Sequence, residues 1–183
     1  MSAFSDRAII LRRERSGETS LVVQLLCRDS GRVDALAKGA LGPGSTAAPV
    51  LDMLHEVDVV LRPPRHGGRA WVQEAVMIES FIGMRSDFPR FDLACYFAAL
   101  VALCVDREHP APEVYDLLRL ALGHLDGHGA SAEVMRRFER RLLILLGLGV
   151  AEGGLSPSRF AAIFEHNFHA LPQGRERLLR RLG

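Results

Sequence analysis

The sequence predicts an α+β protein, with β-strands in its N-terminal half and helices in the remainder. Short runs rich in Val, Leu and Ile, separated by turn residues, fill the first half. After Ser86 the apolar residues recur every three or four positions, as on one face of an amphipathic helix. Strands followed by helices are typical of segregated layers or of two domains. We place the boundary within residues 78–85, which divides the chain into domains 1–80 and 81–183.

The stretch Gly17–Ala40 predicts a β-hairpin on which the arrangement of the first half depends. Two apolar runs, Thr19–Cys27 and Arg32–Lys38, flank the turn segment 28–31. Alternation in the second run places three small apolar residues on one face and mostly charged residues on the other. The apolar face consists of Val33, Ala35 and Ala37. The mostly charged face consists of Arg32, Asp34, Leu36 and Lys38. Such a strand suits a sheet that is buried on one side only.

Three further strands are predicted at Arg7–Arg13, His55–Arg62 and Arg69–Ile78. Residues 39–50, rich in Gly, Pro, Ser and Ala, show no period and are predicted to form a loop. Five short strands joined by turns indicate a small barrel, and the OB-fold is the commonest barrel of five strands. We therefore expect an N-terminal five-stranded OB-fold barrel followed by an all-helical domain.

The second half predicts four helices and a last Arg-rich turn. Ser86, Ser131 and Ser156 are suitable N-caps, and Pro112 occupies a first helical position. The predicted segments are Asp87–Val105, Pro112–Gly127, a third from Ser131 to about Leu148, a fourth from Ser156, and Arg175–Arg181.

Composition limits the classes of function. The net charge of +1 provides no global attraction to nucleic acid or membranes, so any such binding must come from local clusters. No apolar run approaches the roughly 20 residues of a membrane span. Three cysteines without CxxC spacing indicate reduced thiols, and with no signal-peptide pattern we expect a cytoplasmic protein.

No catalytic motif is visible in the sequence, so we expect no enzymatic activity, no cofactor and no metal. Two histidine pairs, His124/His128 and His166/His169, have the spacing of neighbours on a helix and could hold a metal ion. With no further ligands to complete a site, we interpret them as polar surface residues. A metal-dependent enzyme is the least favoured of our hypotheses.

Basic residues gather on the predicted barrel and could contact a phosphate backbone. They are Arg12, Arg13, Arg15, Arg32 and Lys38. The alternative is a solvated rim that nearby carboxylates neutralise, since residues 1–80 hold ten basic and ten acidic side chains. Aromatic residues, on which bases stack, are limited here to Phe4 and Trp71. DNA binding should therefore be weak and led by phosphate contacts.

The third predicted helix carries a basic stripe beside an apolar one. The basic stripe consists of Arg136, Arg137, Arg140 and Arg141. The apolar stripe consists of Val134, Phe138, Leu142 and Leu145. After Leu142 the helix is apolar all round, which predicts burial of that end. This surface suits a peptide that ends in a hydrophobic residue and a carboxylate. The alternative is an ordinary amphipathic helix whose arginines pair with Glu133 and Glu139.

Several blocks resemble the RecO family of bacterial recombination mediators. In the hairpin these are G-E-T-S-L, S-G-R-V and A-L-A-K-G-A, and in the third helix the segment M-R-R-F-E-x-x-L-L-x-x-L-G-x-G at Met135–Gly149. The resemblance extends from about Arg7 to Val150. It implies an OB-fold and a helical domain, which bind and anneal single-stranded DNA and dock on the C-terminal tail of the single-strand-binding protein SSB. With RecR, such proteins help load the RecA recombinase.

The resemblance also implies roles for individual residues. Arg12, Arg13, Arg32 and Lys38 would belong to the DNA-binding barrel, and Arg136 and Arg140 would face the SSB tail. Two departures from the family stand out. No cysteine follows Gly149, which predicts a short form without the zinc module of many relatives, and the loop 41–45 lacks the basic residues that many relatives carry. Two hypotheses remain: a non-enzymatic DNA-binding mediator, or a protein-interaction adaptor of the same fold that has largely lost DNA binding.

Overall fold

The computed structural model describes residues 2–64, 67–149 and 156–183. The chain divides into two compact units. One comprises the residues up to Ser80 together with Val105–Tyr115, and the other comprises Phe81–Cys104 and Asp116–Gly183. The domain limits 1–80 and 81–183 stay a prediction, while in the structure the segment 105–115 groups with the first unit.

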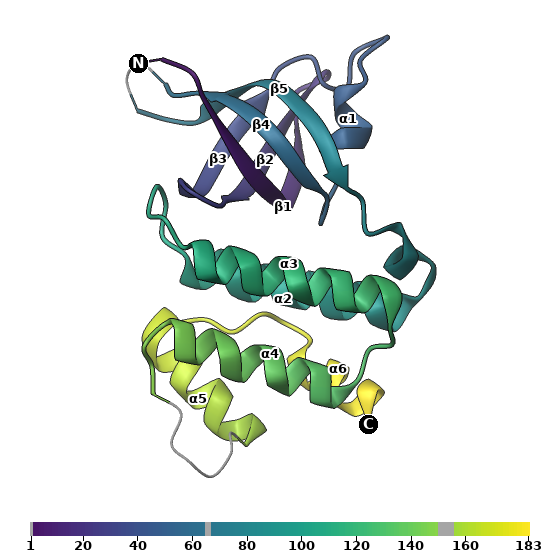
Figure 1. Cartoon of the computed structure of the whole chain (residues 1–183), viewed down its shortest axis with the longest axis vertical. Coiled ribbons are helices and arrows are strands. Elements are labelled where there is room, and N and C mark those ends of the chain that lie inside the picture. Colours follow the sequence, from purple (N-terminus) through teal and green to yellow (C-terminus); the bar gives the residue numbers. More distant parts are fainter. Residues whose placement is uncertain (1, 65–66, 150–155) are drawn as a thin grey trace. The chain divides into compact units, whose positions relative to one another are not determined.

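The first unit is a closed five-stranded barrel with the strand order β1-β2-β3-β5-β4 (Figure 1). Its strands are β1 (Phe4–Ser16), β2 (Ser20–Cys27), β3 (Gly31–Ala37), β4 (Glu56–Arg62) and β5 (Ala70–Glu79). All neighbours are antiparallel except β3 and β5, which pair in parallel. This topology confirms the predicted α+β class with an N-terminal OB-fold barrel.

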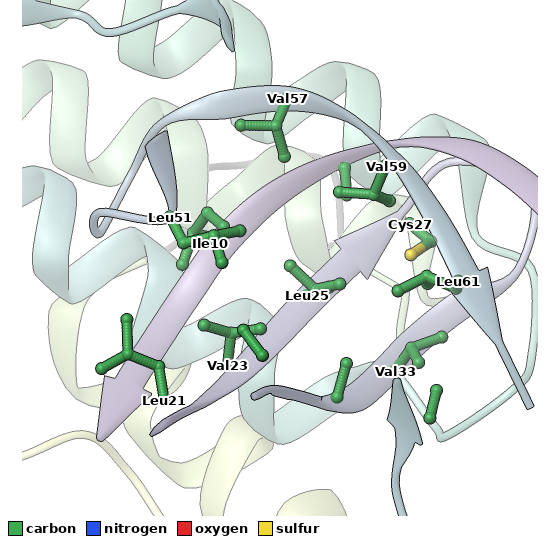
Figure 2. Packing of buried hydrophobic residues seen from close by; sticks show 14 of the residues in the cluster. Ile10, Leu21, Val23, Leu25, Cys27, Val33, Leu51, Val57, Val59 and Leu61 are labelled. Carbon is green, nitrogen blue, oxygen red and sulfur yellow. The ribbon is translucent and has the colours of Figure 1, made fainter. Parts of the chain in front are cut away.

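The barrel encloses a core that follows the predicted alternation. Val33, Ala35 and Ala37 on β3 are buried, and Val57, Val59 and Leu61 on β4 face the same interior. Figure 2 shows side chains of this cluster converging between the strands. On β1 the register shifts between Ile10 and Arg12, a bulge at which four consecutive residues, 8–11, are buried.

The prediction that residues 39–50 form a loop is wrong in part. A single helical turn, α1 (Ala47–Val50), precedes Leu51, which is fully buried in the barrel core (Figure 2). One turn is too short to show a helical period in the sequence, because periodicity is read over windows of eleven or more residues.

The segment that follows α2 covers part of the β3 edge. Arg32 N–H donates to the Asp106 carbonyl (3.4 Å), and Glu108 N–H donates to the Arg32 carbonyl (3.0 Å). At Gly31, φ is +72°, and a Cβ atom there would collide with the carbonyl group of His109. Only glycine fits this turn, since any side chain would be strained and would overlap with backbone.

A buried hydrogen bond links the start of α3 to the barrel. The Tyr115 hydroxyl donates to Glu56 Oε1 at 2.7 Å, and both residues are buried. Simple alternation along β4 would place Glu56 on the same face as the exposed Asp58, but Glu56 is fully buried. The register shift next to Glu56 and the arrival of Tyr115, 59 residues away, explain the difference.

The second unit is helical. It contains the 3₁₀ helix η1 (Ile82–Ser86) and the helices α2 (Phe88–Cys104), α3 (Pro112–Gly127), α4 (Ala132–Leu145), α5 (Pro157–Phe168) and α6 (Arg175–Leu182). The first turn of α3 belongs to the first unit. Ser131 and Ser156 cap α4 and α5 as predicted. The cap of α2 is Asp87 rather than Ser86, because its carboxylate accepts from Arg90 N–H (3.2 Å).

A buried polar cluster joins three helices of this unit. Arg175 of α6 donates to both oxygens of Glu139 on α4, at 2.7 and 2.8 Å. The Tyr96 hydroxyl of α2 donates to the same carboxylate at 2.6 Å. Burial and the neighbouring carboxylate raise the pKa of Tyr96, so the phenol stays a donor. The carboxylate therefore has three donors.

Two expectations for α4 are corrected here. Glu139 does not pair with the surface arginines of its own helix, since it points inward to Arg175. The apolar end of α4 is buried only in part, because Leu142 and Leu143 are fully buried whereas Ile144 and Leu145 are 48% and 41% exposed. A helix end without polar side chains is not buried unless another element covers it. Among the described residues, no element covers this end of α4 fully.

We expect Gly31→Ala to destabilise the protein far more than Gly17→Ala. Gly17 also has positive φ (+68°), but no atom lies within 4 Å of the position that a methyl group would take, so its substitution costs about 1–2 kcal/mol of left-handed strain. Gly31→Ala adds a backbone collision and should cost more than about 3 kcal/mol. Urea unfolding of both variants measures the difference, and equal losses would contradict the close approach of residue 109.

We expect Arg175→Met to cost about 3–5 kcal/mol of unfolding free energy, because it leaves the Glu139 carboxylate buried without its cation. The double variant Arg175→Met/Glu139→Leu should recover part of this loss. Arg180→Met is the control, since its exposed contact with Glu176 (3.9 Å) is worth about 1 kcal/mol or less. A single variant as stable as the control would show that the cluster does not stabilise the fold.

Candidate functional site

A groove of about 990 Å³ lies on the first unit, beside the outward side chains of β3. Its lining comes from β3, from the connection between β4 and β5, from the start of β5 and from the segment after α2. The side chains that define it are Asp34, Leu36, Arg62, Arg69, Trp71 and Arg107. In OB-folds, the β2–β3 face and the β4–β5 connection are where oligonucleotides commonly bind.

Two rows of outward side chains cross the strands at this groove. In the first, Gln24 of β2 lies opposite Arg12 on β1 and opposite Asp34 on β3. In the second, the register runs from Val22 through Leu36 and Trp71 to Arg62. Side chains directly opposite on paired strands are roughly 5 Å apart. A polar row and a largely apolar row therefore lie side by side.

The ion pair in the groove hides its anion and exposes its cation. Arg107 pairs with Asp34 through Nη2 and Oδ2, and Gln24 donates to the other carboxylate oxygen at 3.1 Å. The Asp34 side chain is only 15% exposed, whereas that of Arg107 is 67% exposed. Arg62 and Arg69 are exposed and form no ion pair with any residue that the structure describes. The groove thus presents three guanidinium groups to solvent.

The five barrel residues that the sequence singled out lie outside the lining of this groove. Arg12 pairs with Glu14, and Arg13 pairs with Asp52 (3.0 Å) and donates to the Ala48 carbonyl (3.2 Å). Arg15 donates to the Glu18 carbonyl at 3.4 Å, Arg32 is half-buried, and Lys38 is exposed just beyond β3. Their role in DNA binding stays a prediction. Of the five, Arg12 shares a cross-strand row with Gln24 and Asp34, and Arg32 lies two residues before Asp34 on β3.

Sequence reasoning missed the residues that form the groove. Arg62 and Arg69 flank a Pro-Pro turn that marks only the end of a strand. Arg107 lies in the other half of the sequence and reaches Asp34 through the pairing of its segment with β3. Trp71 was visible as one of two aromatic residues in this half, but no local pattern placed it beside Leu36. Only the parallel pairing of β3 with β5 does so.

A second hollow, of about 340 Å³, lies between α3 and α4 in the helical unit. Its apolar lining includes Leu117, Leu120, Ala121, Val134 and Phe138. Leu120 is 67% exposed, and Phe138 is buried and stacks on Phe97 with ring centroids 3.9 Å apart. A side chain that entered this hollow would therefore rest on a rigid aromatic floor.

The four arginines of α4 are all exposed, but they divide between two hollows. Arg137 and Arg141 line the apolar hollow. Arg136 and Arg140 line a smaller one of about 260 Å³ together with Arg137 and Glu133. Within the basic stripe, Arg137 and Arg141 therefore border the apolar hollow, whereas Arg136 lines only the smaller one. The assignment of Arg136 as a ligand of a carboxylate stays a prediction.

The remaining candidates bear on metal and thiol chemistry. His124 and His128 stack with ring centroids 4.8 Å apart, and His124 lines the apolar hollow. Across the described ranges, no three or more His, Cys, Asp or Glu side chains group as metal ligands. The segment 150–155, predicted to lack a zinc module, lies outside the described residues. Burial raises the pKa of the Cys95 thiol to about 11, so it is protonated at neutral pH.

No helix in the described ranges is long and apolar enough to span a bilayer. Comparison with known proteins then relates the two units to one family. The N-terminal model of recombination protein O matches residues 1–81, and its C-terminal model matches residues 85–151.

Curated relatives agree with these two matches. The chain is 34% identical over 140 residues to the DNA repair protein RecO of Rhodopirellula baltica, across 76% of this chain and 52% of that protein. It is 30% identical to RecO of Desulfosudis oleivorans (81% of this chain, 58% of that protein) and 32% identical to RecO of Rhodopseudomonas palustris (80% and 57%). The chain spans between half and three fifths of the length of these relatives. It belongs to the RecO family of DNA repair proteins.

Proposed function

We propose that this chain is a non-enzymatic recombination mediator, which binds and anneals single-stranded DNA and helps load the recombinase onto SSB-coated DNA. The observation that carries the DNA-binding part is the groove on the barrel with its three exposed arginines, Arg62, Arg69 and Arg107. A guanidinium group donates two parallel hydrogen bonds to a phosphate and keeps its charge at any physiological pH. Three such groups around one groove suit a strand that passes along it.

The same groove favours a mediator over an adaptor that has lost DNA binding. The adaptor hypothesis is favoured by the balance of charges in the barrel and by the uncharged loop 41–49. The balance is not uniform, because Asp34 is shielded by Arg107 and Gln24 while the cations face outward. Local charge, not the sum, decides whether a phosphate backbone is attracted.

We propose further that the hollow between α3 and α4 receives the C-terminal tail of SSB, which is acidic and ends in a hydrophobic residue. The apolar lining would accept the terminal side chain, and Arg137 or Arg141 would bind the terminal carboxylate. Arg136 and Arg140 would attract the acidic residues that precede it. RecR and the RecA-loading step complete the proposal through the family resemblance alone.

DNA affinity should depend on salt through the groove arginines. For single strands, the slope of log affinity against log salt concentration decreases by about 0.7 for each phosphate contact removed. Arg62→Gln/Arg69→Gln should therefore reduce the slope by about 1.4 units, measured by fluorescence anisotropy of a labelled oligonucleotide at several salt concentrations. Replacing Arg12, Arg13 and Lys38 together tests the contacts predicted from sequence.

The control for this experiment is Arg159→Gln/Arg180→Gln, which removes the same charge from α5 and α6. It should leave the slope unchanged, because these residues lie in the other unit. If binding is indifferent to salt, or undetectable at low salt, the adaptor replaces the mediator as the proposed function.

Tail binding should depend more on Arg137 than on Arg136, because only Arg137 borders the apolar hollow. Loss of one charge-assisted contact costs about 1.5–3 kcal/mol, a tenfold or greater loss of affinity. Titration with an acidic peptide ending in Phe measures the effect in Arg137→Ala and Arg136→Ala. Arg12→Ala serves as the control, since it should weaken DNA binding and leave the peptide affinity unchanged. Equal affinities in wild type and in both α4 variants would place the tail elsewhere.

A further inference from the structure

We propose that Trp71 is a stacking platform for an unpaired base, and that this contact makes the groove selective for single-stranded over double-stranded DNA. The proposal rests on the proposed DNA-binding function and adds a specificity determinant to it. It also modifies the expectation that binding is led by phosphates alone.

Trp71 lines the groove on β5, the strand between β3 and β4. It is the second residue of β5, directly after the connection that carries Arg69 and ends at the groove. Its neighbours in register are Leu36 on β3 and Arg62 on β4. Trp71 is 42% exposed, although its ring is the largest apolar side chain of the barrel strands. A base placed there would meet an apolar surface between cations.

The barrel does not require Trp71 for its own core. Along β5, Ala70 is buried in the core and Val72 packs against it, so that alternation directs Trp71 to the outside. The residues beside it in the outward row, Val22 and Leu36, are half-buried and continue an apolar strip across β2 and β3. An exposed tryptophan at the end of an apolar strip is typical of a contact surface rather than of packing.

The charges around this strip indicate a nucleic-acid strand as the occupant. Arg62 and Arg69 line the groove on either side of the β4–β5 connection, and the polar row next to the apolar strip ends in the Asp34–Arg107 pair. Binding of single strands combines such a cationic track with aromatic rings on which bases stack. A purely apolar protein partner would have to bury three exposed guanidinium groups and to remove their water, which costs free energy.

Stacking on Trp71 would discriminate between strands and duplexes for a simple physical reason. In a duplex, both faces of each internal base are already covered by neighbouring bases. An unpaired strand can turn a base face to the indole without breaking pairs, whereas a duplex must unstack first, at a cost of a few kcal/mol. Phosphate contacts alone make no such distinction.

Intrinsic fluorescence reports on this one site, because Trp71 is the only tryptophan of the chain. The experiment titrates the full chain with a dT oligonucleotide, with an abasic strand of the same number of phosphates, and with a duplex of equal length. Anisotropy of a terminal dye measures binding of each in parallel. We expect strong quenching of Trp71 by the dT strand and weak quenching by the abasic strand and the duplex.

Substitution gives the second readout. Trp71→Leu should lower affinity for the dT strand about fivefold to a hundredfold, which corresponds to loss of one stacked base. It should leave affinity for the abasic strand unchanged, and Trp71→Phe should retain most of the preference. Thermal melting of Trp71→Leu should match wild type, since the side chain lies outside the core.

The outcomes separate this proposal from the proposed function. Salt-dependent binding by anisotropy without quenching, and with equal affinity in Trp71→Leu, would overturn the stacking site and leave DNA binding intact. Absence of binding in anisotropy would overturn both. Quenching by the acidic SSB-tail peptide in place of DNA would show that the groove is a protein-binding site and would likewise overturn the proposal.

Discussion

The N-terminal half of β3 has an edge whose backbone groups need partners, and the pairing that supplies them organises the first unit. β3 pairs with β5 at only two positions, Ala35 and Leu36. Nearer its start, Arg32 exchanges hydrogen bonds with the segment that contains Asp106 and Glu108. Buried backbone groups left unpaired would cost free energy comparable to lost hydrogen bonds, and an open edge would invite other strands. The barrel therefore depends on residues that follow α2 in the sequence.

The same pairing also builds the groove. It pairs Arg107 with Asp34, so that the guanidinium group neutralises the one carboxylate among the described lining residues and stays exposed itself. A surface ion pair is worth about 1 kcal/mol or less. Arg12 can therefore exchange Glu14 for a phosphate at small cost, since both side chains are exposed. Arg107 is itself 67% exposed and can donate to a phosphate while it stays paired with the largely buried Asp34. An arginine that is paired with a carboxylate in the absence of DNA therefore remains able to bind a phosphate.

Local signals in the sequence predicted most of the fold but only the periphery of the groove. Alternation predicted the β3 face of Val33, Ala35 and Ala37, and capping residues predicted the starts of α4 and α5, because these patterns act within a few residues. Contacts between distant segments had no such pattern. Glu56 meets Tyr115 across 59 residues, and the register of β3 with β5 decides which residues stand beside Trp71. The family was predictable from its sequence motifs, whereas the lining of the groove required the topology.

The inward position of Glu139 has a consequence for the outer surface of α4. If Glu133 and Glu139 both faced solvent, the four arginines of the helix would carry a surplus of 4 − 2 = +2 charges. Because Arg175 and Tyr96 bind Glu139 inside the unit, only Glu133 remains on that surface and the surplus is 4 − 1 = +3. Exposed surplus charge raises the rate at which an oppositely charged partner associates and disfavours partners of the same sign. The buried cluster therefore both joins α2, α4 and α6 and increases the attraction of the helix for an acidic peptide.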